Sequence, residues 1–152
     1  MTGTRDLTLL LFLALVMGGG LAVGYYTRPG DWYLELTKPS FNPPGWVFGP
    51  VWTVLYVMIA VAGWRLWYAA DAGVTRALWW LQLLLNFSWS PAFFAAQQIG
   101  TALAIIVVLL ITIVSLIALT WRHHRITSLL FVPYAAWVAF ATALNTAIFQ
   151  LN

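Results

Sequence analysis

Long uncharged apolar runs alternate with short polar connections along the whole chain. A bilayer core of about 30 Å needs about 20 helical residues to cross it. Five runs approach that length, at about 7–26, 46–64, 77–96, 101–121 and 128–151. Most of the connections between them are short, so consecutive helices should be antiparallel neighbours. The pattern predicts an all-α membrane protein, with residues 1–152 forming a single five-transmembrane-helix bundle.

The composition supports a membrane location. Hydrophobic residues make up 62% of the chain and charged residues 7%, whereas soluble domains are roughly 25% charged. The net charge is +3, but the seven basic residues are dispersed between apolar runs, so we interpret them as topology signals and expect no nucleic-acid partner. The absence of cysteine excludes disulfides, a thiolate nucleophile and cysteine metal ligands.

The distribution of basic residues predicts an orientation. If the protein lies in a bacterial inner membrane, the positive-inside rule places the N-terminus in the cytoplasm. The first run resembles a secretory signal, but it lacks an A-x-A-like cleavage site, and we therefore expect an uncleaved span of a multi-pass protein. One side of the membrane would carry Arg5, Arg65, Arg76, Arg122 and Arg125, and the other only Arg28 and Lys38.

The connection at residues 27–45 and the start of the next helix form the most distinctive stretch. Within residues 38–56 four prolines fix the backbone, which predicts a stiff, extended approach to the helix; they are Pro39, Pro43, Pro44 and Pro50. Trp52 and Tyr56 then lie four residues apart on one helical face. Trp32 and Tyr33 of the connection fit either an interfacial aromatic belt or a lid over a pocket, because loops of this length are often functional.

The third run is the most polar of the five. Gln82, Asn86 and Ser90 fall near one face, with Phe93 beside them, and Pro91 interrupts the helical hydrogen bonds. Uncharged amides inside a membrane commonly join helices, and this is our interpretation of Gln82. For Asn86 a ligand-facing role is an equal alternative, because binding pockets combine apolar walls with a few polar groups.

Other helices carry small residues beside aromatic ones. Gly20 and Gly24 of the first run have a spacing that allows close helix packing, either within the bundle or at a dimer face. On the last run Tyr134 and Trp137 share a face with Ala141, Leu144 and Asn145.

The sequence lacks the residues that several kinds of membrane chemistry require. None of the five runs contains Asp, Glu, Lys or His, which excludes a proton relay or an ion pump. A Ser-His-Asp set and a phosphate-binding loop are also missing. His123 and His124 are adjacent and therefore project to different sides, so we expect no metal site.

Three motifs together resemble the translocator protein family, also called tryptophan-rich sensory protein, TspO/MBR or peripheral-type benzodiazepine receptor. They are KPSFNPPGWVFGPVWTVLY, LNFSWSPAFF and PYAAWVAFATALN, and the likeness covers nearly the whole chain. The resemblance implies a five-helix bundle in membrane lipid, often a homodimer. It also implies a pocket under the first loop for porphyrins, sterol-like lipids and benzodiazepine-type drugs, with porphyrin as a ligand and no required cofactor.

The resemblance also assigns residues. Trp52 and Trp137 match a pair of indoles implicated in light-dependent porphyrin breakdown, and are the candidate catalytic residues. The segment LNTAIFQLN lacks the Tyr and Arg of the sterol motif found in animal members. The implied ligand-binding set is Tyr33, Trp52, Tyr56, Asn86, Ser90, Phe93, Trp137, Ala141 and Leu144.

The functional prediction is a membrane receptor or sensor for porphyrins and other hydrophobic small molecules, linked to tetrapyrrole regulation. Two alternatives remain. The protein could degrade porphyrins in the light through its indoles, or it could transport tetrapyrroles or lipids, although alternating access normally uses inverted repeats or intramembrane charges.

Overall fold

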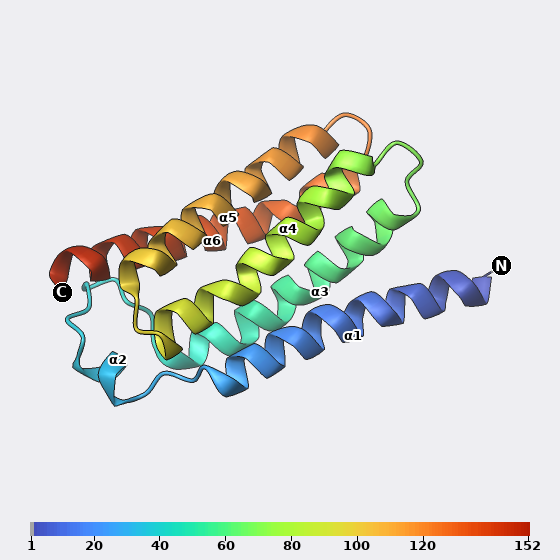
Figure 1. Cartoon of the computed structure of the whole chain (residues 1–152). Coiled ribbons are helices and arrows are strands. Elements are labelled where there is room, and N and C mark those ends of the chain that lie inside the picture. The colour runs from blue at the N-terminus through green and yellow to red at the C-terminus, as the bar shows by residue number, and fades with distance from the viewer. Residues whose placement is uncertain (1) are drawn as a thin grey trace.

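The computed structural model describes residues 2–152, with the side chain of Thr2 left out, and within that range it contains helices and no strand. Figure 1 shows the long helices lying alongside one another, with the short helix α2 in the connection at one end. A 3-10 turn, η1 (Gly45–Val47), leads into α3, and a π-helical turn, η2 (Pro91–Ala95), ends α4. The α-helices are α1 (Thr2–Tyr26), α2 (Asp31–Glu35), α3 (Phe48–Trp67), α4 (Gly73–Ser90), α5 (Ile99–Thr120) and α6 (Arg125–Leu151).

The predicted apolar runs correspond to α1, α3, α4, α5 and α6, so the all-helical fold class is confirmed. Four of these helices are long and apolar enough to cross a membrane, namely Gly3–Tyr26, Gly45–Trp67, Ile99–Thr120 and Arg125–Leu151. The helix α4 is not among them, because it carries polar residues such as Gln82 and Asn86 along its length. The short helix α2 was not predicted.

The long helices pack in a closed ring. Helix α1 contacts α3, α3 contacts α6, α6 contacts α5, α5 contacts α4, and α4 returns to α1. The side chains of Ile59, Trp79, Ile113 and Phe131 fill the interior of this ring. Helix α3 also contacts α4 across the ring, so each long helix buries one face against two or three neighbours.

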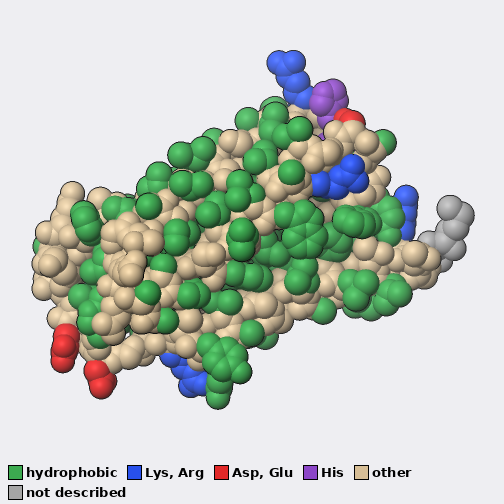
Figure 2. Space-filling model, in the orientation of Figure 1, with side chains coloured by type: hydrophobic (Ala, Val, Ile, Leu, Met, Phe, Trp, Pro, Cys, Tyr) green, Lys and Arg blue, Asp and Glu red, His purple; other side chains and the backbone are tan. Residues whose placement is uncertain are grey.

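The outside of the bundle is also apolar. Large exposed hydrophobic side chains include Leu11, Leu84, Ile111 and Leu129, which lie on four different helices. In Figure 2 hydrophobic side chains cover much of the length of the molecule, and charged side chains gather toward its two ends. This distribution suits helices surrounded by lipid, because hydrocarbon can cover apolar side chains but cannot satisfy charges.

Pro91 changes the helical pattern at the end of α4. Proline has no amide hydrogen to donate to the preceding turn. The amide of Ala96 instead donates to the carbonyl of Pro91 at 2.8 Å, which is the five-residue spacing of a π-helix. Gln97 then takes a φ of 56°, a left-handed conformation that ends the helix and turns the chain toward α5. The predicted interruption at Pro91 is therefore present.

Gly63 should be essential to the contact between α3 and α4. A Cβ atom at this position would overlap the indole of Trp79, which is buried and donates from Nε1 to the carbonyl of Ile59 at 3.0 Å. We predict that Gly63→Ala lowers the free energy of unfolding by about 1–3 kcal/mol, because the ring must move from a packed site. Unfolding by a denaturing detergent, followed by circular dichroism, measures this change.

Gly18→Ala is the matched control. Gly18 is exposed on α1, and nothing lies within 4 Å of a Cβ atom built there. Alanine should leave stability unchanged or raise it slightly, because it restricts the unfolded chain. Equal losses in the two variants would contradict the proposed packing role of Gly63.

Candidate functional site

A cavity of about 1060 Å³ lies between α1, α3, α4 and the connection at residues 27–45. Its walls are mainly apolar and aromatic, with a few hydroxyl and amide groups. The helices contribute Gly20, Leu21 and Gly24 from α1, Phe48, Trp52 and Tyr56 from α3, and Asn86, Trp89 and Ser90 from α4.

Two glycines shape the α1 wall of this cavity. Gly20 is buried, and a Cβ atom there would overlap the ring of Tyr56, so this position lets α1 approach α3 closely. At Gly24, one turn later, a Cβ atom would meet nothing within 4 Å. Gly20 therefore allows close packing within the bundle, which is one of the two roles that its spacing to Gly24 suggested. Gly24 leaves space in the cavity.

Asn86 sits at the deep side of the cavity and also joins helices. Its amide nitrogen donates to the Tyr134 hydroxyl at 2.8 Å, and its oxygen accepts a hydrogen bond from the Tyr56 hydroxyl at 3.3 Å. The Tyr134 hydroxyl in turn donates to the side-chain oxygen of Gln82 at 2.8 Å. Gln82 therefore links helices as expected, and Asn86 both links helices and lines the cavity.

Aromatic rings form the walls beside Asn86. The rings of Trp52 and Tyr56 have centroids 5.2 Å apart at an interplanar angle of 31°. The Trp89 ring stacks on Phe93 at 5.2 Å and 27°. The Nε1 atom of Trp89 donates to the side-chain oxygen of Asn145 at 3.0 Å, which fixes the indole orientation. These rings are therefore held in place by packing and hydrogen bonds.

The connection at residues 27–45 forms part of the cavity wall, and contacts with η2 and with the end of α6 hold it in place. Tyr33 packs against Phe94 with ring centroids 5.3 Å apart, and the Lys38 ammonium lies 4.6 Å from the centre of the Tyr33 ring. Partial burial raises the pKa of Tyr33 above its ordinary value, so its hydroxyl stays neutral at physiological pH. Asn152 exchanges two hydrogen bonds of 2.9 Å with the backbone of Thr37.

The structure brings part of the expected ligand set together at this cavity. Tyr33, Trp52, Tyr56, Asn86 and Ser90 are among its lining residues. The remaining four do not line it: Phe93 lies in η2, and Trp137, Ala141 and Leu144 lie on α6.

These four residues have other surroundings, and Ala141 packs against the main core cluster. Phe93 and Leu144 are buried in a second apolar cluster behind Trp89. The ring centroids of Trp137 and Phe48 lie 5.8 Å apart. Phe48 lines the cavity, so Trp137 contacts a wall residue without lining the cavity itself. In the described part of the chain the Nε1 atom of Trp137 is buried without a hydrogen-bond partner.

Sequence reasoning did not identify the α1 wall of the cavity. The spacing of Gly20 and Gly24 signalled close packing but not a binding surface. Thr27 gave no signal, yet its hydroxyl lies 2.6 Å from that of Ser90 and joins the end of α1 to the end of α4 at the cavity. Among residues 2–152, no three His, Asp or Glu side chains gather where they would hold a metal ion.

Comparison with known proteins places the whole bundle in one family. The model of the TspO/MBR family matches residues 12–151. The chain is 42% identical to the tryptophan-rich protein TspO of Chlorobaculum tepidum, over 94% of this chain and 97% of the relative. It is 33% identical to the tryptophan-rich sensory protein of Cereibacter sphaeroides, over 97% and 93%. It is 39% identical to the translocator protein of Homo sapiens, over 80% and 75%.

These matches agree with the three sequence motifs, each of which falls within the matched region. They also agree with four helices that have the length and hydropathy of membrane spans. The chain is therefore an integral membrane protein and belongs to the TspO/MBR family.

Proposed function

We propose that this protein is a membrane receptor or sensor that binds porphyrins and related flat hydrophobic ligands in the cavity between α1, α3 and α4. The observation that carries the proposal is the cavity itself, with a volume of about 1060 Å³ and mainly apolar walls. Ligand pockets typically combine apolar and aromatic walls with a few polar groups. Relatives named as sensory and translocator proteins support the same class of function.

The proposed chemistry is aromatic stacking with polar contacts at the ligand edge. A porphyrin macrocycle is flat and would stack on aromatic rings, and Trp52 and Tyr56 line one wall of the cavity. Lys38 and Ser90 also line the cavity. The Lys38 ammonium would pair with a ligand carboxylate, and the Ser90 hydroxyl would hydrogen-bond a polar edge.

We also propose that α4 is a fifth membrane span. Helix α4 and η2 run without a break from Gly73 to Ala95, and α4 packs against α5 and α1. Its amides at Gln82 and Asn86 are buried inside the bundle, while Leu84 faces outward. The polar groups that lower the hydropathy of α4 would therefore not meet lipid. The end of the bundle that holds the start of α1 and most of the basic residues would face the cytoplasm.

A cavity-filling substitution tests the binding site directly. Gly24 lines the cavity, and nothing lies within 4 Å of a Cβ atom built there. We predict that Gly24→Leu weakens protoporphyrin binding by about tenfold or more, because the leucine side chain would fill space that the ligand occupies and would reduce the apolar ligand surface that the cavity can bury. Titration of protoporphyrin against intrinsic tryptophan fluorescence in detergent measures the affinity.

Gly18→Leu provides the control for this substitution. Gly18 lies on the same helix, is exposed, and is not among the residues that line the cavity. This variant should bind protoporphyrin as the unmodified protein does. If both variants bind with unchanged affinity, the ligand does not occupy this cavity.

The connection at residues 27–45 would act as a lid, and Asn152 would hold it closed. Asn152→Ala removes both hydrogen bonds to the backbone of Thr37. We predict roughly three- to tenfold faster dissociation of protoporphyrin, because the lid opens more often. Stopped-flow fluorescence measures the rate. Gln150→Ala, an exposed neighbour on α6, should leave the rate unchanged; an equal acceleration in both variants would argue against a lid.

The position of Trp52 favours a second candidate function, light-dependent porphyrin breakdown. Trp52 lines the cavity, so its indole could donate an electron to a photoexcited bound porphyrin, which passes it to dissolved O2; O2 is then the oxidant and the source of oxygen for ring opening. We predict that Trp52→Phe slows the loss of porphyrin absorbance under illumination by about tenfold, since phenyl rings are much harder to oxidise. Trp137→Phe should have a smaller effect, because Trp137 contacts Phe48 but does not itself line the cavity.

Trp121→Phe is the control for the illumination experiment. Trp121 is exposed at the far end of α5 and packs against Arg125. It should leave the rate of breakdown unchanged. Breakdown that proceeds at the same rate in the Trp52, Trp137 and Trp121 variants would show that these indoles take no part in the reaction.

A further inference from the structure

A second cavity, of about 290 Å³, lies at the opposite end of the bundle from the first. It is formed by the start of α1, the end of α3 and the connection from α5 into α6. Its lining includes Arg5, Trp64, Arg65, Tyr68, His124 and Thr127. Three of these side chains are basic types, and no acidic side chain lines the cavity among the described residues.

The side chains around this cavity are held in defined positions. The Trp64 indole donates to the carbonyl of Arg5 at 3.1 Å, and the Arg5 guanidinium lies 4.9 Å from the centre of the Tyr68 ring. The Tyr68 hydroxyl donates to Thr8 at 2.8 Å. Helices α1 and α3 are thus joined at this end, with Arg5 against the cavity wall.

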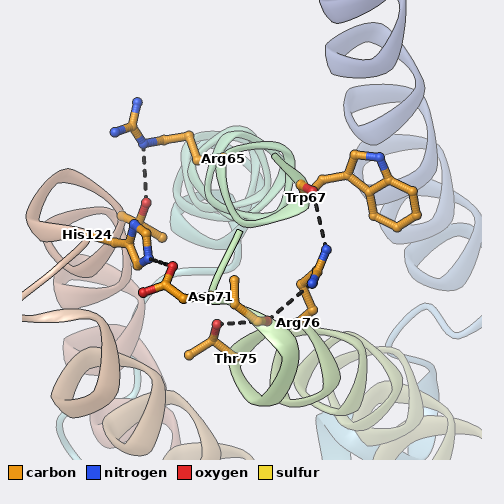
Figure 3. Close-up of polar contacts among 8 residues, drawn as sticks. Arg65, Trp67, Asp71, Thr75, Arg76 and His124 are labelled. Atoms are coloured by element: carbon orange, nitrogen blue, oxygen red, sulfur yellow. Dashed lines mark hydrogen bonds and ion pairs between the residues drawn. The ribbon is translucent and has the colours of Figure 1, made fainter. Parts of the chain in front are cut away.

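Arg65 uses little of its hydrogen-bonding capacity within the chain. Its Nε donates to the Thr127 hydroxyl at 3.2 Å, and Figure 3 shows its two terminal nitrogens pointing away from the other residues drawn. Arg76, in the same figure, instead donates to the carbonyls of Trp67 and Ala72. The two terminal nitrogens of Arg65 are the part of the guanidinium that can bind an oxyanion in a bidentate manner.

The acidic residue beside His124 is Asp71. Asp71 Oδ1 lies 3.1 Å from His124 Nε2, within hydrogen-bond distance. Its own backbone amide and His124 both lower the pKa of Asp71, so the carboxylate is ionised at neutral pH. Within residues 2–152 no carboxylate lies within 4.0 Å of the guanidinium nitrogens of Arg5 or Arg65.

We propose that this cavity binds a phosphate-type oxyanion through the guanidinium groups of Arg5 and Arg65. Two unpaired guanidinium groups in one small cavity attract an anion, and partial burial of Arg65 strengthens the attraction. Trp64 and Tyr68 are residue types that lie at the membrane surface, which is the level of lipid headgroups. The oxyanion is the phosphate of a membrane lipid headgroup or a free phosphate ion. This site is separate from the proposed porphyrin cavity.

Binding of two probes to the full-length protein in a nonionic detergent tests the inference. Inorganic phosphate and a short-chain phosphatidic acid are titrated separately by calorimetry at low salt. At least one of them should bind saturably. The Arg65→Gln variant should bind that probe about tenfold or more weakly, because a charge-assisted hydrogen-bond pair is lost. Saturable binding of phosphatidic acid alone identifies a lipid headgroup, and binding of inorganic phosphate identifies a free anion.

Arg122→Gln is the matched control, because Arg122 is exposed at the same end of the bundle but does not line the cavity. It should change affinity by no more than about twofold, as expected for a screened surface charge. If Arg65→Gln does not fold, as judged by circular dichroism, Arg5→Gln replaces it, since Arg5 is exposed. The inference is wrong if neither probe saturates, or if Arg122→Gln weakens binding as much as the cavity variants.

Discussion

The buried hydroxyl of Tyr134 is the contact on which the arrangement of the bundle depends. It accepts from Asn86 Nδ2 and donates to Gln82 Oε1, so that one group on α6 bonds both amide side chains of α4, while Gln82 Nε2 is buried without a partner among the described residues. Tyr56 of α3 adds a third helix to this network. In an apolar interior a polar group without a partner is costly. The register of α4 against α3 and α6 is therefore set by hydrogen bonding as well as by packing.

The position of the large cavity follows from this network. With α3, α4 and α6 joined through Asn86 and Tyr134, the remaining space lies on the other side of Asn86, toward α1. Gly20 brings α1 against Tyr56, and Gly24 leaves the next turn without a side chain; both glycines line the cavity. Pro91 ends the regular part of α4 at the same level, and Thr27 bonds to Ser90 there. Close packing in one turn and open space in the next are thus parts of the same helix contact.

Hydrophobic pattern alone was sufficient to predict the helices, because uncharged runs of this length have few other structures available in a membrane. Helical spacing also placed Trp52 and Tyr56 on one face, and both line the cavity. Spacing does not tell which neighbour a face meets, however. Trp137 shares a face with Tyr134, yet Tyr134 joins the polar network while Trp137 packs behind Phe48. Helix α2 was missed because five residues carry too little periodicity to be recognised.

The separation of polar groups along the bundle limits the chemistry of each cavity. In the large cavity the lining residues within the helices are aromatic, aliphatic, amide or hydroxyl types, with Lys38 in the connection as the one cationic group among the described lining residues. Such walls bind flat apolar ligands by stacking and offer no carboxylate or imidazole for proton transfer. The small cavity has the opposite character, with two guanidinium groups beside interfacial rings. Since α1 and α3 contribute to both cavities, the same pair of helices presents an apolar site at one end and a cationic site at the other.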